Sequence, residues 1–354
     1  MKIFVFGDVH WSSYSSIIRS HGEKYSKRLE NLIQTISWVE ESARINNCDR
    51  IVCLGDFFDK AELNSSELTA LQEISWLNDI PHTFLVGNHE MGRSNLQISS
   101  AHVLGLGENL DVVDSPSIYN VDGKTQLCFL PYILESDRKP LTEYFQQTNK
   151  DRIIFSHNDI RGIQMGRFVS QEGFNIEEIE ACCRLFVNGH LHNGTTEGKN
   201  IINLGNITGQ NFSEDAHKYR HTALIIDTDT FEVQWIENPY AFNFYKLDFS
   251  DCMEDRDDPY IQEALERIGP NAVVTIKVNK ESKFFVEDLL STMDNIVECR
   301  IIVDMTVSNN TVYENNEQDF SVDHIQQFVN YVKTEISSDK EVLEELSKIT
   351  GGVV

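Results

Sequence analysis

The stretch IFVFGDVH at residues 3–10 decides the fold of this 354-residue chain. Four apolar residues are followed at once by glycine, aspartate and histidine, which is the pattern of a short buried strand ending in polar chemistry. Later apolar runs end in the same way: RIVCLGDFFD at 50–59, HTFLVGNHE at 82–90, RIIFSHN at 152–158 and RLFVNGHLH at 184–192. Since ligands bind beyond the carboxyl ends of strands in open α/β sheets, we expect these five ends to converge.

The rest of the first 240 residues alternates strand and helix patterns. Further apolar runs predict short buried strands at 126–130, 200–204 and 222–227. Apolar residues at helical spacing predict amphipathic helices over 26–45 and 65–78. This alternation indicates a layered α/β domain over residues 1–240.

The composition is strongly acidic, with 30 Lys and Arg against 56 Asp and Glu and a net charge of −26. Such a charge argues against a DNA-binding protein that relies on a basic patch, although metal ions can supply the missing positive charge. With 40% hydrophobic and 10% aromatic residues, the chain can form a real core, which excludes a disordered acidic protein.

The sequence also predicts the compartment. No apolar run approaches the roughly 18 residues that span a membrane, so no membrane partner is expected. The first residues are typical of a strand rather than a signal peptide. The seven cysteines form no CxxC pair and several lie in apolar runs, which favours buried free thiols in a reducing cytoplasm.

Beyond residue 240 the pattern changes. The charged stretch DCMEDRDDPY at 251–260 resembles a linker, and a small α/β unit is expected at 255–310. Within this unit a strand, a helix and a strand are predicted at 271–278, 284–293 and 297–307. Two helical patterns at 320–354 close the chain. Residues 241–354 hold 10 basic and 23 acidic residues, so half of the net charge lies in the last third.

The polar residues at the five strand ends are of types that bind metals. The candidate ligands are Asp8, His10, Asp56, Asn88, His157, His190 and His192. The set contains no thiolate, which argues against a structural zinc site of the cysteine type. Seven ligands are too many for one tetrahedral ion and suit two ions that share a carboxylate. Mixed nitrogen and oxygen ligands favour manganese, iron or zinc over calcium.

Taken together, DVH, GDFFD, GNHE, a mid-chain SH and GHLH closely resemble the signature motifs of calcineurin-like metallophosphoesterases. The resemblance covers about residues 1–240. It implies a four-layer α-β-β-α sandwich that carries a dinuclear metal centre. It also implies ligand sets of Asp8, His10 and His192 for one ion and Asn88, His157 and His190 for the other, with Asp56 bridging.

The same resemblance gives roles to two neighbouring residues. His89 would lie near the scissile phosphate as proton donor or charge stabiliser, and Glu90 would orient it by accepting from its second ring nitrogen. A metal-bridging hydroxide would attack phosphorus in line, because two dications lower the pKa of a shared water.

The region beyond residue 240 favours the nuclease branch of the superfamily. Catalytic motifs followed by a small α/β unit and terminal helices resemble SbcD-type DNA double-strand-break repair nucleases, and FSHNDIRGIQMG at 155–166 resembles phage-encoded members. This implies an exo- or endonuclease that uses two divalent ions, Mn²⁺ foremost, with Mg²⁺, Fe²⁺ or Zn²⁺ as alternatives. The implied partners are DNA and an SbcC-like coiled-coil ATPase that docks on the terminal helices, around a homodimer within a heterotetramer.

Two other functions stay open at the level of sequence. One is a small-molecule phosphodiesterase or phosphatase of the same superfamily, in which the tail serves as a lid or dimer arm. The other is a catalytically silent scaffold, which the complete ligand set disfavours.

Overall fold

The computed structural model describes residues 1–304 except 122, 124, 146–150, 166–167, 251–257 and 281–282. Met1–Asp304 forms one compact unit. The helices predicted at 320–354, and most of the linker predicted at 251–260, lie outside the described residues. No helix within the described part of the chain is long and apolar enough to cross a bilayer.

The first of two six-stranded sheets contains the strand that opens the chain. Its order is β16 (Val233–Glu237), β15 (Thr222–Asp227), β1 (Lys2–Phe6), β2 (Arg50–Cys53), β3 (His82–Leu85) and β6 (Leu110–Val113). Strands β1, β2, β3 and β6 run parallel; at one edge β15 pairs antiparallel with β1, and β16 pairs antiparallel with β15.

The second sheet repeats this plan. Its order is β13 (Thr195–Glu197), β14 (Ile201–Asn203), β12 (Leu185–Asn188), β9 (Arg152–Ser156), β8 (Gln126–Leu130) and β7 (Ser117–Asn120). The four central strands are parallel, while β13 and β7 are antiparallel edge strands.

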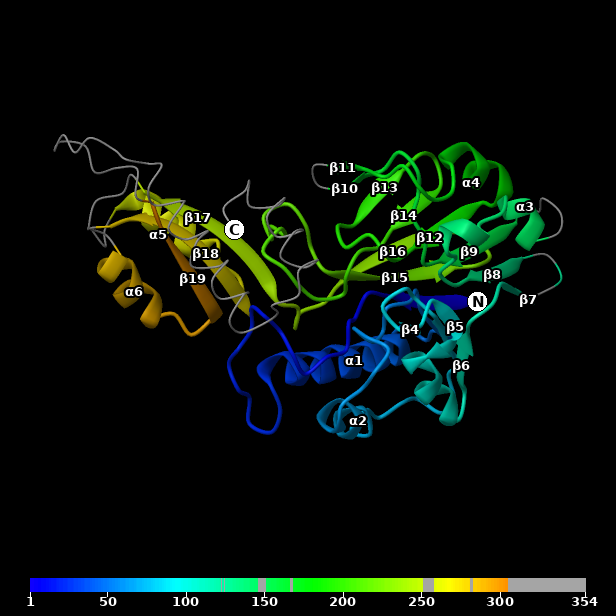
Figure 1. Ribbon diagram of the computed structural model, residues 1–354, viewed down its shortest axis with the longest axis horizontal. Helices are drawn as coiled ribbons and strands as arrows, with labels where there is room; N and C mark the ends of the chain where they lie inside the picture. The colour runs from blue at the N-terminus through cyan, green and yellow to red at the C-terminus, as the bar shows by residue number, and fades with distance from the viewer. Residues whose placement is uncertain are drawn as a thin grey trace, which may run out of the picture. The chain divides into compact units, whose positions relative to one another are not determined.

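Alternation along β1 shows how the layers form. Ile3 and Val5 pack into the apolar core between the two sheets, whereas Phe4 and Phe6 point to the other face and pack under the first helices. Helices α1 (Lys27–Ile45) and α2 (Ser65–Leu71) cover the first sheet, and α3 (Leu141–Tyr144) and α4 (Ile176–Cys182) cover the second (Figure 1). The molecule therefore has the predicted four-layer α-β-β-α sandwich.

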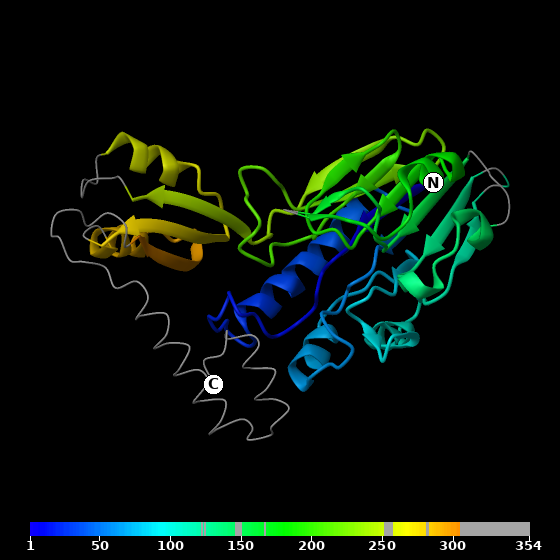
Figure 2. The same cartoon turned by 45° about the horizontal axis from the view of Figure 1, so that its top comes forward.

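The two predicted helices of the first layer differ in outcome. Helix α1 starts after Ser26, whose side chain accepts a hydrogen bond from the Leu29 amide, and it matches the predicted range 26–45. Figure 2 shows this long blue helix running along the sheets.

Helix α2 ends at Leu71, although the apolar spacing predicts a helix to residue 78. Tertiary contacts explain the difference. The ring of Trp76 packs 5.8 Å from that of Phe84, and the Leu77 amide donates to Glu40 at 3.0 Å. These contacts, with the buried side chains of Ile74 and Ile80, hold the segment after α2 against the core in a non-helical conformation.

A third sheet follows the sandwich. It is parallel and consists of β17 (Asn243–Phe249), β18 (Ala272–Asn279) and β19 (Ile296–Asp304), with α5 (Pro259–Glu266) and α6 (Lys283–Ser291) packed on it. The sequence predicts β18, α6 and β19 but not β17. Lys246 and Asp248 interrupt the apolar residues of β17, so it lacks the continuous run by which buried strands are recognised.

Shorter elements complete the described residues. They are the strands β4 (Met91–Gly92), β5 (Asn95–Ser99), β10 (Gln164–Met165) and β11 (Phe168–Val169) and the 3₁₀ helices at Ser100–Leu106 and Glu135–Asp137.

Candidate metal centre

The five motif-bearing strand ends meet at one place in the sandwich. Strands β1, β2 and β3 supply three of them from the first sheet, and β9 and β12 supply two from the second. Two glycines make the close approach possible. A Cβ atom at Gly87 would lie 2.1 Å from the Asp56 carboxylate, and Gly55 has a φ of +105° against the ring of His157.

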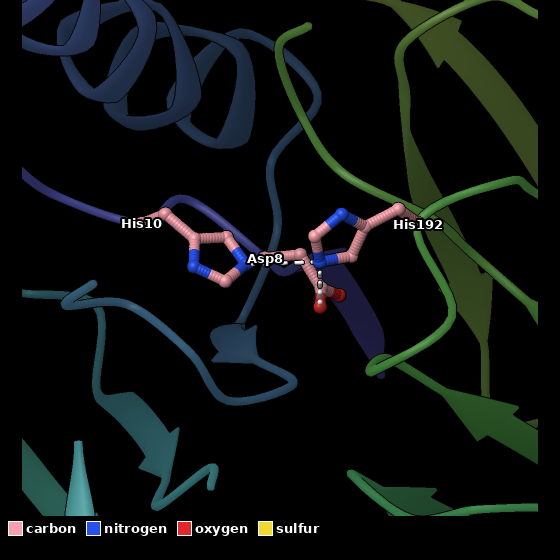
Figure 3. Close-up of side chains that lie close together, drawn as sticks. All are labelled: Asp8, His10 and His192. Atoms are coloured by element: carbon pink, nitrogen blue, oxygen red, sulfur yellow. Dashed lines mark hydrogen bonds and ion pairs between the residues drawn. The ribbon is translucent and has the colours of Figure 1, made fainter. Parts of the chain in front are cut away.

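Asp8, His10 and His192 form the first ligand cluster (Figure 3). The Nε2 atoms of His10 and His192 face each other at 3.1 Å, and Nε2 of His192 lies 3.9 Å from the Asp8 carboxylate. Asp8 and His10 are buried, and the side chain of His192 is 30% exposed. This cluster could hold one cation that substrate can reach.

The second cluster gathers around the amide of Asn88. Its Oδ1 lies 3.2 Å from Nε2 of His157 and 2.9 Å from Nδ1 of His190. These rings come from the second sheet, whereas Asn88 follows β3 of the first. A cation bound here would be shared by both sheets.

Asp56 lies between the clusters. Its Oδ2 is 3.1 Å from Nε2 of His157 and 3.9 Å from Nε2 of His10, while Oδ1 accepts a hydrogen bond from the His89 amide at 3.0 Å. Burial raises the pKa of Asp56, but His157 and His10 lower it further, so the carboxylate stays ionised. The structure thus brings all seven predicted ligands together and places Asp56 between the two clusters.

The histidine rings are oriented as metal ligands are. His157 bonds through Nδ1 to the Leu54 carbonyl at 2.8 Å, and His190 faces the Asp159 carboxylate through Nε2 at 3.2 Å. In each ring the other nitrogen, which carries the lone pair when the ring is neutral, points to the centre. The donor set therefore fits two divalent cations that accept mixed nitrogen and oxygen ligands.

The predicted catalytic pair is arranged differently from the expectation. The buried Glu90 carboxylate accepts from the Phe58 amide at 2.9 Å and the Gly87 amide at 2.8 Å. Nδ1 of His89 lies 3.1 Å from the Asp59 carbonyl oxygen and 3.8 Å from its carboxylate. Glu90 therefore holds the backbone of the neighbouring motifs. Asp59, and not Glu90 as expected, lies beside the ring of His89.

Asp59 is a functional residue that the sequence reasoning missed. Its carboxylate also lies 3.3 Å from Nδ1 of the ligand His10. It stands in the quoted motif GDFFD, so its proximity to the ligands was visible, but its contacts depend on how three loops fold together. Asp159, which faces His190, was missed for the same reason.

Comparison with known proteins identifies the family. The model of the calcineurin-like phosphoesterase family matches residues 1–274, and the chain belongs to this family. A protein of Escherichia phage T5 named "Probable exonuclease subunit 1" is 28% identical over 200 residues, which are 54% of this chain. The aligned part spans 57% of that relative's length.

Two solved structures are similar in part. One is Yfce, a phosphoesterase from E. coli, with a TM-score of 0.31, and the other is a dimetal phosphatase from Danio rerio, with a TM-score of 0.38. Each is 12% identical and covers 67% of this chain, with 100% and 99% of the respective structure aligned.

Family and site define a metal-dependent hydrolase of phosphoester bonds. Within it, the Nδ1 contact to Asp59 leaves Nε2 of His89 as the ring atom available to a substrate oxygen. The ring is 42% exposed, so it can reach a bound phosphoester.

Asp59→Asn tests the role of the missed carboxylate. We expect hydrolysis of bis(p-nitrophenyl) phosphate to slow about 10- to 100-fold, because His10 loses the carboxylate that faces its Nδ1 at 3.3 Å, whereas His89 keeps its contact with the Asp59 carbonyl. Asp114→Asn is the matched control, since Asp114 pairs with the surface residue His102 at 3.7 Å. An unchanged rate in Asp59→Asn would refute the positioning role.

A buried polar network adjoins the turn that carries Asp8. The Glu214 carboxylate accepts from the Gln210 amide and from Nδ2 of Asn206, each at 3.0 Å, and lies 3.6 Å from Nε2 of His221. His221 bonds through Nδ1 to the Asn206 carbonyl at 2.9 Å. Burial raises the pKa of Glu214 to about 7 and lowers that of His221 to about 4.

This network predicts a pH-dependent loss of stability. Because the pKa of Glu214 rises on folding from 4.5 to about 7, the folded state holds the proton longer, and stability falls as pH rises through this window. The group contributes about 3 kcal/mol to this fall. Urea unfolding of the metal-free chain at pH 5 and pH 8 should show that the unfolding free energy of the wild type falls relative to that of Glu214→Gln, in which His221 still titrates and raises stability over part of the same window. Equal pH dependence of the two proteins would contradict the prediction, and the exposed Glu237→Gln serves as control.

Proposed function

We propose that this chain is a DNA nuclease that hydrolyses phosphodiester bonds as the nuclease subunit of an SbcCD-like repair or recombination complex. The similarity to the phage T5 exonuclease subunit carries the proposal, since it names the nuclease branch of a family that also contains phosphatases. The chain resembles SbcD-type members in its motifs and in the α/β unit that follows the sandwich. The free cysteines of the described residues fit a reducing compartment, because all but Cys299 are buried.

The proposed cofactor is a pair of divalent ions, with Mn²⁺ first among the candidates. Two such ions lower the pKa of water and neutralise charge on the phosphoryl oxygens. The chain's own contribution is to hold seven ligands and to place His89, whose exposed ring would donate a proton to the leaving oxygen. Asp59 keeps that ring in place through Nδ1.

The net charge of −26 limits how DNA can bind. The acidic chain as a whole repels DNA phosphates, so the attraction would come from electrostatic contacts with the metals, the partner subunit and a few local basic residues. We expect weak, steeply salt-dependent binding of DNA by the isolated chain. Tight binding of duplex DNA without metal would contradict this view.

One groove offers chemistry suited to a nucleic acid strand. It has a volume of about 810 Å³ and lies between the segment after His10, the loop around Phe212 and strand β19. The Arg300 guanidinium stands 5.1 Å over the ring of Phe212, and Arg19 is exposed nearby. Among the residues that the structure describes, neither arginine forms an ion pair, and the one carboxylate of the groove, Glu298, accepts hydrogen bonds from the Arg19 and Ser20 amides at 2.9 Å. This groove supports the proposal that the unit at 255–310 contacts DNA.

The proposed assembly is a homodimer within a heterotetramer that contains a coiled-coil ATPase of the SbcC kind. The helices at 320–354, which would dock the ATPase, lie outside the described residues. Their part in the proposal rests on the resemblance of the chain's layout to SbcD-type nucleases.

The direct test is hydrolysis of labelled linear duplex and single-stranded DNA with Mn²⁺, with and without an ATPase encoded beside this gene. We expect metal-dependent cleavage that the ATPase increases. His89→Ala should lower cleavage about 100-fold or more, since general acid catalysis is lost, while the metal content stays near that of the wild type. His102→Ala, which alters an exposed histidine elsewhere, is the control.

Each other result has a definite meaning. Full activity in His89→Ala would remove the assigned role of this residue. Cleavage of a model phosphodiester but not of DNA, even with the ATPase, would favour a small-molecule phosphodiesterase or phosphatase. If the metal-loaded protein hydrolyses no phosphoester, the remaining alternative is a catalytically silent scaffold.

The groove is tested separately by Phe212→Ala and Arg300→Ala. Loss of the stacking ring should weaken binding of single-stranded DNA about 5-fold or more, and loss of the guanidinium should reduce the salt slope by about one. Hydrolysis of bis(p-nitrophenyl) phosphate should be unchanged in both variants. Arg267→Ala, which alters an exposed arginine directly after α5, is the matched control, and equal DNA affinity of all variants would exclude this groove.

A further inference from the structure

The turn that carries Asp8 and His10 has an unusual backbone. Asp8 has a φ of 50° and His10 a φ of 49°, both in the left-handed region that residues with a side chain seldom occupy. Each such residue costs about 1 to 3 kcal/mol and persists only where its surroundings hold it. The contacts of this turn therefore show what keeps both ligands directed at one cation.

The amide groups of the turn are held by the neighbouring motif. The Asp8 amide donates to the Gly55 carbonyl at 3.1 Å, and the His10 amide donates to the Asp56 carbonyl at 2.9 Å. These bonds fix one side of the turn. They leave its carbonyl oxygens to other partners.

The carbonyl groups are held by two side chains from distant parts of the sequence. Nε2 of Gln210 donates to the Asp8 carbonyl at 2.9 Å, and the guanidinium of Arg28 donates to the His10 carbonyl at 3.1 Å. Arg28 belongs to α1, and Gln210 follows β14 in the loop before β15. Asp8 and His10, two of the three residues of the first cluster, thus have their peptide groups fixed from both sides.

The two side chains are themselves tightly held. Arg28 is only 5% exposed; burial lowers its pKa, and the carboxylates of Asp59 and Glu214 partly offset this effect. The backbone of Gln210 is fixed by its hydrogen bond to Glu214. A buried arginine is expensive unless it has a specific partner, and here that partner is the carbonyl of a ligand residue.

We propose that Arg28 and Gln210 are positioning residues for the first metal subsite, which clamp the left-handed Asp8–His10 turn so that both side chains face the same cation as His192. The clamp acts on this subsite alone. Asn88, His157 and His190 take their orientation from other contacts, such as the bonds of the two rings to Leu54 and Asp159. The inference holds whatever phosphoester the enzyme cleaves.

The experiment is a calorimetric titration of the metal-free full chain with Mn²⁺ alone. We expect two binding events in the wild type. In Arg28→Met and Gln210→Leu, one event should weaken about 10- to 100-fold, the usual effect of losing a group that orients a ligand, while the other stays within about 2-fold. Arg28→Lys should recover part of the affinity, because it restores a donor and a charge.

Arg50→Met is the matched control. Arg50 is also a buried arginine, 8% exposed, but it donates to the Thr83 hydroxyl within the first sheet. We expect this variant to lose stability and keep both binding events unchanged. Gln210→Leu decides the matter if Arg28→Met does not fold, since Gln210 is partly exposed.

Two results would overturn the proposal. One is wild-type affinity at both sites in the Gln210→Leu and Arg28→Met proteins. The other is an equal loss at both sites, matched by Arg50→Met, which would mean that these side chains serve only general stability. Neither result depends on DNA cleavage, so the clamp and the proposed nuclease function can fail independently.

Discussion

The contact between Asp56 and His157 is the interaction on which the rest of the site depends. It joins the end of β2 in the first sheet to the end of β9 in the second, with 3.1 Å between the carboxylate and the ring nitrogen. Both residues are buried, and an ionised carboxylate is stable there only with positive charge beside it. The two sheets must therefore pack at a fixed distance from each other, and the apolar core between them sets that distance.

Glycine and backbone strain are the means by which this meeting is achieved. Gly87 lets the third motif pass against the Asp56 carboxylate, where no larger residue fits. Asp56 and His190 have left-handed backbones, as do the ligands on the first turn. The apolar layers that surround the turns offset this local cost, so stability is exchanged for a fixed ligand geometry.

Much of this arrangement could be predicted from the sequence, because it depends on continuous stretches in which apolar strand residues are followed by polar ligand residues. Each ligand follows an apolar strand directly, and strand ends of a parallel sheet lie together by geometry. What could not be predicted depends on contacts between distant segments. Helix α2 ends early because Trp76 packs into the core, and Asp59 replaces Glu90 beside His89 because three loops fold together. Arg28 and Gln210 carry no local signal at all.

The pairing of Asp56 with His157 also changes what an empty centre means. Burial lowers the pKa of His157, but Asp56 raises it more, so the metal-free ring holds a proton more tightly than an ordinary histidine. The positive charge on the protonated ring stabilises the Asp56 carboxylate as a metal cation would, and it helps to keep the ends of β2 and β9 together. Loading is therefore an exchange, in which an incoming metal displaces the proton from a pocket that is already shaped. Binding of the metal would therefore release acid into solution.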